Sequence, residues 1–333
     1  MTKTRKREYA QELAVAVQAV GEAARLCDAV QSALGPDTLE KRDRSPVTVA
    51  DFGSQALICD VLGRAFPGDP IIAEEDSRAL QKEENRPLVE RLVHQVGRIR
   101  AGADEAQICG WIDRGNATDY AQRFWTLDPI DGTKGFLRGD QYAVSLALVV
   151  DGELVVAALA CPNLTVMVGG RTRRGICFHA VRGQGAFELP LGEHAEPIPI
   201  RVSEMRETSG IRFCESVEAA HSSHGDAARI AKRLAIKAEP VRIDSQAKYA
   251  MVARGQAEAY LRLPKDQAYR EKIWDHAGGA LVVAEAGGRV TDIAGKSLDF
   301  THGRTLDTNK GVIVTNGHVH EPILQAITDL GIG

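Results

Sequence analysis

Apolar residues recur at every third or fourth position in several long stretches of this chain, which is the spacing of one buried helix face. Between residues 8 and 34 one such face is formed by Leu13, Val17, Val20, Ala24, Cys27 and Leu34. Gly35-Pro36 then ends this helix. The same spacing predicts a helix that ends before Pro67-Gly68, and further helices over residues 88–99, 227–234, 246–253, 274–286 and 323–330.

Shorter apolar runs between turn signals predict strands. In the first half they cover residues 71–73, 142–150, 154–161, 165–168 and 175–181, with Asp151-Gly152 as a hairpin turn. These strands indicate helices packed on a largely antiparallel sheet, and the polar residues 77–86 indicate an irregular loop. After the proline-containing stretch 189–200, strands at 211–214, 257–263 and 311–315 alternate with helices. We therefore expect an α+β domain over residues 1–200 and an α/β domain over 201–333.

Composition excludes several classes of protein. The chain has 333 residues, 44% of them hydrophobic, and a formal net charge of −4 without a long basic run, which argues against binding to a nucleic-acid polymer. No stretch reaches the roughly 18 apolar residues that a membrane span needs. Six dispersed cysteines without a C-x-x-C pair indicate neither a zinc site nor a disulfide framework, so we expect a reducing, cytoplasmic compartment.

The stretch 125–135, WTLDPIDGTKG, carries the densest candidate chemistry. Pro129 has no N–H to donate and fixes its own backbone angle, so a tight turn is expected in place of a regular strand. That turn would point Asp128 and Asp131 the same way, beside the carbonyl of Ile130. Three hard oxygens suit Mg²⁺. An Asx-rich turn that caps a helix is the alternative for such a motif in isolation.

Other carboxylates stand at the expected ends of helices and strands, namely Asp51, Glu74 and Asp275. For Asp51 the alternative is a capping box with Thr48 at the helix start. Five acidic groups at such ends exceed what capping needs, and two or three Mg²⁺ ions would neutralise them. If the Thr133 hydroxyl meets Asp51, the pair can take a proton from an attacking water.

The order of these motifs resembles the inositol monophosphatase superfamily of Mg²⁺-dependent, Li⁺-sensitive phosphatases. The motifs are Thr48-x-x-Asp51, Glu74-Glu75, Asp128-Pro129-Ile130-Asp131-Gly132-Thr133 and Trp274-Asp275-x-Ala277-Gly278-Gly279. Longer strings, among them DPIDGTKGFLR from Asp128, DSQAKY from Asp244 and YLRLP from Tyr260, resemble the 3'(2'),5'-bisphosphate nucleotidases within it. The resemblance covers nearly the whole chain and implies a layered αβαβα sandwich.

The resemblance also implies residue roles. Metal would be bound by Glu74, Asp128, the Ile130 carbonyl, Asp131 and Asp275. Asp51 and Thr133 would activate water. The substrate would be held by Gly132, Thr133, His221, Ser245, Lys248 and Arg262. The implied reaction removes the 3'-phosphate of adenosine 3',5'-bisphosphate to give AMP, with 3'-phosphoadenylyl sulfate as a further candidate substrate.

Alternatives remain open at this point. A phosphatase of inositol phosphates would share the acidic residues, and a catalytically silent metal-binding protein would have lost one of them, which is not the case here. A hairpin about Gly169-Gly170 would set Cys161 nearly opposite Cys177, at a spacing compatible with a disulfide. Buried, unpaired thiols are the alternative to that bridge.

Overall fold

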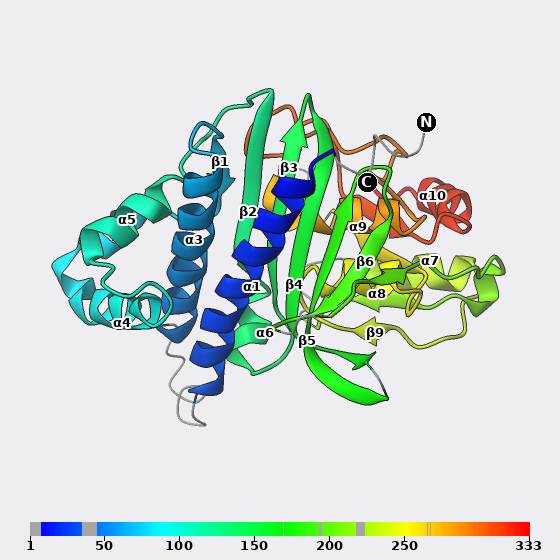
Figure 1. The fold of residues 1–333 in the computed structure, drawn as a ribbon. Helices are drawn as coiled ribbons and strands as arrows, with labels where there is room; N and C mark the ends of the chain where they lie inside the picture. The colour runs from blue at the N-terminus through cyan, green and yellow to red at the C-terminus, as the bar shows by residue number, and fades with distance from the viewer. Residues whose placement is uncertain are drawn as a thin grey trace.

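A computed structural model describes residues 8–34, 45–168, 170–192, 195–217, 224–264, 266 and 268–333. Its elements stack in five layers, in the order helices, sheet, helices, sheet, helices (Figure 1). Three clusters of buried hydrophobic side chains fill the spaces between these layers.

The first helical layer contains α1 (Ala10–Ser32), α3 (Ser45–Ala65), α4 (Arg86–Gly97) and α5 (Glu105–Asp113). Helix α3 begins three residues before Thr48, so Thr48 and Asp51 lie inside the helix and the capping-box interpretation is wrong. Residues 77–81 and 83–85, expected as an irregular loop, form two short 3₁₀ helices. Helix α5 has no sequence prediction, although Asp104 and Gln107 form a capping box at its start.

The first sheet has seven strands, paired in the order of the sequence. They are β1 (Ile71–Ala73), β2 (Arg123–Asp131), β3 (Ala143–Val150), β4 (Glu153–Val168), β5 (Arg171–Val181), β6 (Ala186–Pro190) and β7 (Ile198–Ile200). Only β1 and β2 run parallel, so the expectation of a largely antiparallel sheet is confirmed.

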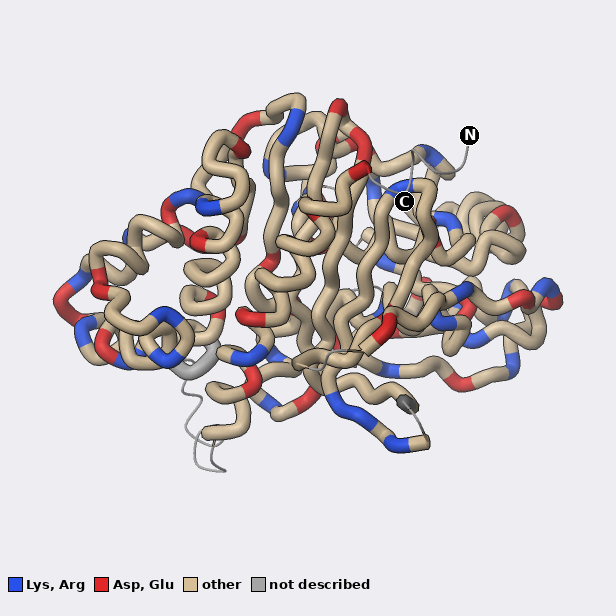
Figure 2. Tube along the Cα trace, in the orientation of Figure 1, with Lys and Arg blue, Asp and Glu red and all other residues tan. Residues whose placement is uncertain are grey.

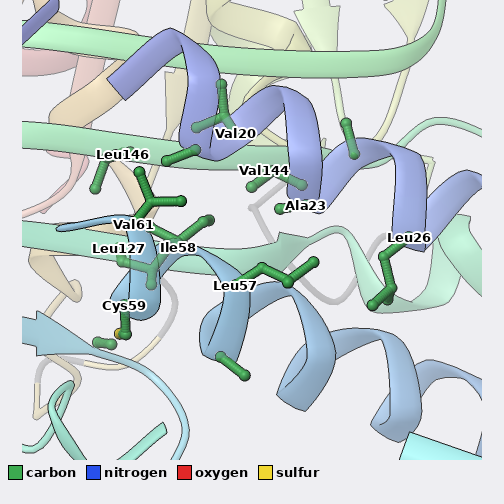
Figure 3. Close-up of a cluster of buried hydrophobic side chains, with 14 of the residues drawn as sticks. Val20, Ala23, Leu26, Leu57, Ile58, Cys59, Val61, Leu127, Val144 and Leu146 are labelled. Atoms are coloured by element: carbon green, nitrogen blue, oxygen red, sulfur yellow. The ribbon is translucent and has the colours of Figure 1, made fainter. Parts of the chain in front are cut away.

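Alternate residues of the central strands face opposite helical layers. Leu146 belongs to the core beneath α1 and α3, together with Val20 and Leu57 (Figure 3), whereas its neighbour Ala147 belongs to the core on the other side. Both faces of the sheet are thus covered, which explains why its strands read as continuous apolar runs.

The same alternation rules out a disulfide between Cys161 and Cys177. In the β4–β5 ladder Cys161 lies opposite Ile176, and Cys177 lies opposite Ala160. An offset of one residue directs the two side chains to opposite faces. Cys177 joins the core beneath α1 and α3, Cys161 joins the other core, and both are free thiols. The pairing is therefore wrong, and the alternative of buried, unpaired thiols holds.

The middle helical layer and the second sheet come from the rest of the chain. Helices α8 (Ala247–Ala253) and α9 (Ala277–Glu285) share one core with both sheets. The second sheet runs in the order β11 (Arg289–Thr291), β12 (Val312–Thr315), β10 (Ala259–Arg262), β8 (Phe213–Glu215), β9 (Val241–Arg242). Helices α7 (His224–Arg233) and α10 (His320–Asp329) form the outer layer. The first sheet ends at residue 200, but because the two sheets share a core, two separate domains divided there stay a prediction.

Charges of both signs are interspersed along most of the chain (Figure 2). One local exception is the start of β5, where Arg171, Arg173 and Arg174 lie close together. Within the described residues, every helix is too short or too polar to cross a membrane.

Candidate active site

The motif at Asp128 lies at the end of β2, which continues to Asp131 against the expectation that Pro129 would exclude a strand. The pairing with β3 is irregular here, because the three-residue step from Asp128 to Asp131 corresponds to two residues of β3. Such an extra residue bends the strand and re-aims its side chains. The Ser54 hydroxyl of α3 donates to the Pro129 carbonyl at 2.9 Å, which anchors the bend.

The chain turns sharply after Asp131. Gly132 has a φ of 90°, and a Cβ there would lie 2.9 Å from the Cβ of Ser245, so only glycine fits without a shift. Helix α6 (Thr133–Leu137) follows directly.

A cleft of about 430 Å³ opens at this turn and is lined by both halves of the chain. Ten of the predicted site residues line it: Glu74, Asp128, Ile130, Asp131, Gly132, Thr133, Ser245, Lys248, Arg262 and Asp275. His221 lies outside the described residues.

Asp51 lines a neighbouring cavity with Glu75. The Gln55 side chain of α3 holds the backbone of Glu75 there. Its Nε2 donates to the Glu75 carbonyl at 2.6 Å, and its Oε1 accepts from the Glu75 N–H at 3.0 Å. No hydrogen bond joins Asp51 to Thr133, although both belong to the described part of the chain. Activation of water by this pair therefore stays a prediction.

The acidic residues of the cleft repel one another strongly. Burial, together with the charges of Glu74 and Asp131, raises the pKa of Asp128 well above its usual range. Burial and the neighbouring Glu75 raise the pKa of Glu74 to about 7, and burial with the charge of Asp131 raises the pKa of Asp275 to about 7. These shifts indicate carboxylates whose burial and mutual repulsion outweigh the attraction of the nearby cations.

One oxygen atom supports the same conclusion directly. Asp128 Oδ1 is buried and has no hydrogen-bond partner among the described residues. A buried carboxylate oxygen without a partner is costly unless a cation neutralises it. Crowded hard oxygens of this kind fit Mg²⁺, so the residues present are suited to the metal that the motif implied.

Two cations line the part of the cleft built from the second half of the chain. Lys248 is 4% exposed, its Nζ lies 5.1 Å from the centre of the Tyr260 ring, and burial lowers its pKa. Arg262 donates through Nε to Glu271 at 3.1 Å.

A chain of hydrogen bonds supports Arg262. Tyr249 contacts His276 Nδ1 at 2.7 Å, and His276 Nε2 contacts Glu271 Oε2 at 3.1 Å. Burial alone would raise the pKa of Glu271, but the contacts with His276 and Arg262 lower this pKa to about 2. Ligand atoms of Glu271, Asp275 and His276 lie within 4.8 Å of one another, a grouping that could also hold a metal. Because Glu271 already binds His276 and Arg262, we assign it to the support of Arg262.

Gln246 is a buried junction that the sequence did not single out as a site residue. Its Oε1 accepts from Ser145 Oγ at 3.1 Å and from the Gly279 N–H at 3.0 Å, while its Nε2 donates to the Trp274 carbonyl at 2.9 Å. It therefore connects β3, α9 and the segment that leads to Asp275.

Further cleft residues were also missed: Lys134, Gly135, Leu137, Ser216, Asp244, Tyr249, Tyr260, Tyr269 and His276. Asp244, Gln246 and Tyr249 belong to the DSQAKY string and Tyr260 to YLRLP, so a signal for them was present. Tyr269, which is 50% exposed, lies in no such string.

Comparison with known proteins now identifies the class. The model of the inositol monophosphatase family matches residues 7–331, so the chain belongs to this family. A solved structure, CysQ from Bacteroides thetaiotaomicron, described as a bacterial member of the family, superposes with a TM-score of 0.64 at 20% identity, covering 93% of this chain and 99% of that one. The expected layered α+β fold is confirmed.

Curated relatives place the chain more closely. A protein of Schizosaccharomyces pombe is 43% identical over 95% of this chain and 94% of its own length, and one of Oryza sativa is 45% identical over 96% and 94%. Both are named 3'(2'),5'-bisphosphate nucleotidase. The resemblance noted in the motifs is confirmed, and these relatives support a phosphatase activity.

Proposed function

We propose that this protein is a Mg²⁺-dependent 3'(2'),5'-bisphosphate nucleotidase that converts adenosine 3',5'-bisphosphate to AMP and phosphate. The observation that carries the proposal is one cleft with an acidic cluster and two cations, the buried Lys248 and the half-buried Arg262. The names of the curated relatives support the same substrate. 3'-Phosphoadenylyl sulfate, which has the same 3'-phosphate, is a second candidate substrate.

The acidic cluster would hold two or three Mg²⁺ ions through Glu74, Asp128, the Ile130 carbonyl, Asp131 and Asp275. When bound, the metal would neutralise these carboxylates and supply Lewis acidity. Asp51, together with the Thr133 hydroxyl, would take one proton from the attacking water. The Gly132-Thr133 turn would offer backbone N–H groups to the 3'-phosphate.

The cations would bind the phosphate that is not cleaved. Lys248 and Arg262 can each form charge-assisted hydrogen bonds with a 5'-phosphate, worth roughly 1.5–3 kcal/mol per bond. This corresponds to about tenfold to more than a hundredfold in affinity. Ser245 lies beside them in the cleft, and His221 takes its proposed nucleoside contact from the motif resemblance alone.

Phosphate release from a matched set of substrates tests the proposal. The wild-type protein should hydrolyse adenosine 3',5'-bisphosphate with Mg²⁺, lose activity in excess chelator, and be inhibited by Li⁺. Inositol 1-phosphate lacks the second anion and the base, so it should be a much poorer substrate. Equal turnover of the two would favour an inositol phosphatase, and full activity in chelator would exclude the metal mechanism.

A further inference from the structure

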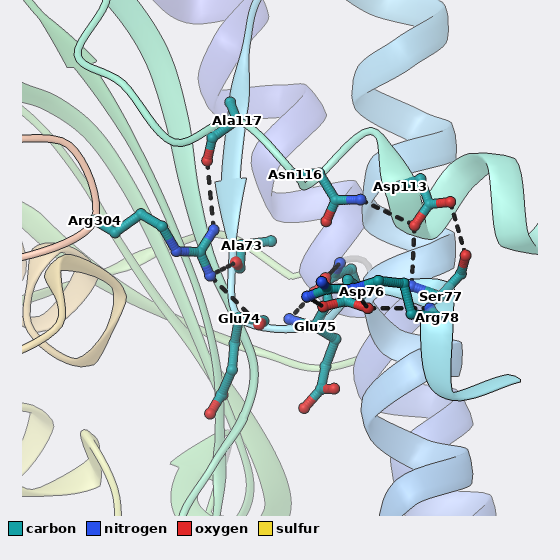
Figure 4. Close-up of polar contacts among 11 residues, drawn as sticks. Ala73, Glu74, Glu75, Asp76, Ser77, Arg78, Asp113, Asn116, Ala117 and Arg304 are labelled. Carbon is teal, nitrogen blue, oxygen red and sulfur yellow. Dashed lines mark hydrogen bonds and ion pairs between the residues drawn. The ribbon is translucent and has the colours of Figure 1, made fainter.

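Arg304 reaches from the segment between β11 and β12 to the end of β1 in the first sheet (Figure 4). Its Nη2 donates to the Ala73 carbonyl at 2.7 Å and to the Glu74 carbonyl at 3.5 Å, and its Nη1 donates to the Ala117 carbonyl at 3.4 Å. Ala73 is the last residue of β1. The guanidinium therefore holds the backbone from which the Glu74 side chain extends.

The same residue also holds the segment that carries Asp275. The Ile273 N–H donates to the Arg304 carbonyl at 3.2 Å, and Lys272 forms an isolated bridge with Thr305. The Arg304 guanidinium also stacks over the Trp274 ring, 4.5 Å from its centre. Asp275 follows Trp274 directly, so Arg304 holds both the backbone that leads to Asp275 and the side chain next to it.

We propose that Arg304 is a positioning residue of the metal site, which sets the spacing between Glu74 and Asp275. These two carboxylates come from different halves of the sequence and line one cleft. The planar fork of arginine can bind several carbonyls and stack on a ring at the same time, which a lysine cannot do. The metal in this inference rests on the proposed function.

A charge effect and a positioning effect of Arg304 predict opposite changes in Mg²⁺ affinity when the residue is replaced. A cation near a metal site repels the metal, so charge alone predicts that its removal tightens Mg²⁺ binding. If Arg304 acts by positioning, its removal lets the two carboxylates drift apart and weakens binding. The direction of the change therefore distinguishes the two effects.

The test measures Mg²⁺ binding to metal-free, full-length protein by titration calorimetry and by the Mg²⁺-induced rise in melting temperature. Arg304→Met and Arg304→Lys should both weaken Mg²⁺ binding by about tenfold or more, as outer-shell partners of metal ligands typically do. At saturating Mg²⁺, KM for adenosine 3',5'-bisphosphate should change by less than about twofold, because Lys248 and Arg262 are untouched.

Arg254 provides a matched control. It also binds a backbone carbonyl, that of Thr165 at 3.3 Å, and lies over an aromatic ring, that of Phe178 at 5.7 Å, but it does not line the cleft. Arg254→Met should lower the melting temperature and leave Mg²⁺ affinity unchanged.

Three results would overturn the inference: unchanged Mg²⁺ affinity in the Arg304 variants, an equal loss in Arg254→Met, or tighter binding in Arg304→Met with no change in Arg304→Lys. If Arg304→Met does not fold, Arg304→Lys decides the question. Weakened Mg²⁺ binding in the variants, together with no nucleotide turnover by the wild type, would support the inference and refute only the proposed substrate.

Discussion

Asp131 Oδ2 accepts a hydrogen bond from the backbone N–H of Gln246 at 2.5 Å. This bond joins the end of β2 to the residue that precedes α8, the helix that carries Lys248. Ser245, the residue before Gln246, adopts a left-handed backbone with φ 68° and brings the two segments together. A proposed metal ligand and a proposed phosphate ligand are therefore set relative to each other by one contact.

Replacing Asp131 tests the acidic cluster without removing this contact. In Asp131→Asn the amide oxygen can still accept from Gln246, so the fold should be kept, but one ligand charge is lost. We expect kcat/KM to fall by more than the roughly 10- to 100-fold that is typical of outer-shell changes. Steady-state kinetics and circular dichroism measure the two effects. A variant that keeps most of its activity would exclude Asp131 as a metal ligand.

The sequence predicted those parts of the site that local chemistry determines. Asp128, Ile130 and Asp131 line one cleft because the bend in β2 that directs them lies within four residues, and Gly132 has a positive φ at the turn that follows. The wrong expectation that Pro129 excludes a strand came from the same local argument, since a strand that bends at an extra residue can include proline.

Long-range contacts could not be predicted in this way. Arg304 and Glu271 act through residues in other elements, and no local pattern distinguishes them from solvated charges. Thr48 and Asp51 looked like a capping box because the true start of α3, at Ser45, follows a charged stretch of sequence without an apolar period. The suggested cysteine pair failed because the β4–β5 register shifts between Cys161 and Thr165, an irregularity that sequence patterns rarely reveal.

Selectivity between substrates should depend on the two cations. Lys248→Ala and Arg262→Ala should each lower kcat/KM for adenosine 3',5'-bisphosphate by about tenfold or more, because each removes a charge-assisted contact with the 5'-phosphate. Turnover of adenosine 3'-monophosphate, which lacks that group, should change much less. Equal losses of kcat/KM on both substrates would show that neither residue binds the 5'-phosphate.

Glu271 should act on the substrate through Arg262. Glu271→Gln keeps a hydrogen-bonding side chain but removes the charge opposite Arg262, so KM for the bisphosphate should rise while kcat changes little. Glu271→Ala leaves Arg262 without its partner, and loss of one member of a buried ion pair costs about 3–5 kcal/mol. Chemical denaturation of both variants measures this difference. Equal stability of Glu271→Ala and the wild type would contradict the assigned support role.

Gly132 should be intolerant of any side chain, and Gly139 provides its control. Both have a positive φ, 90° and 75°, but a Cβ on Gly132 would lie 2.9 Å from Ser245, whereas nothing lies within 4 Å of one on Gly139. Gly139→Ala should cost only backbone strain, on the order of 1 kcal/mol. Gly132→Ala should lose more stability than Gly139→Ala. It should also lower kcat, because the new Cβ pushes Asp131 and Ser245 apart. Similar stability and activity in the two variants would mean that the contact relaxes freely.

Stability in acid should depend on His320 in α10. Its side chain is fully buried, and its two ring nitrogens lie 2.9 Å from the hydroxyls of Thr291 and Thr315. Burial, with a smaller contribution from the charge of Arg289, lowers the pKa of His320 from 6.5 to about 4. Between these values the unfolded chain binds more protons than the folded one, so this group lowers stability as pH falls from 6.5 towards 4.

A variant without the titrating group isolates this effect from the carboxylates of the cleft. His320→Gln keeps a polar side chain near both threonines but cannot gain a proton in this range. Melting temperatures at pH 7.5 and pH 5 should therefore fall more in the wild type than in His320→Gln. The difference in melting temperature between the wild type and His320→Gln should become smaller as the pH is lowered. If the melting temperatures of the two proteins fall equally with pH, His320 is not the acid-sensitive group of the outer layer.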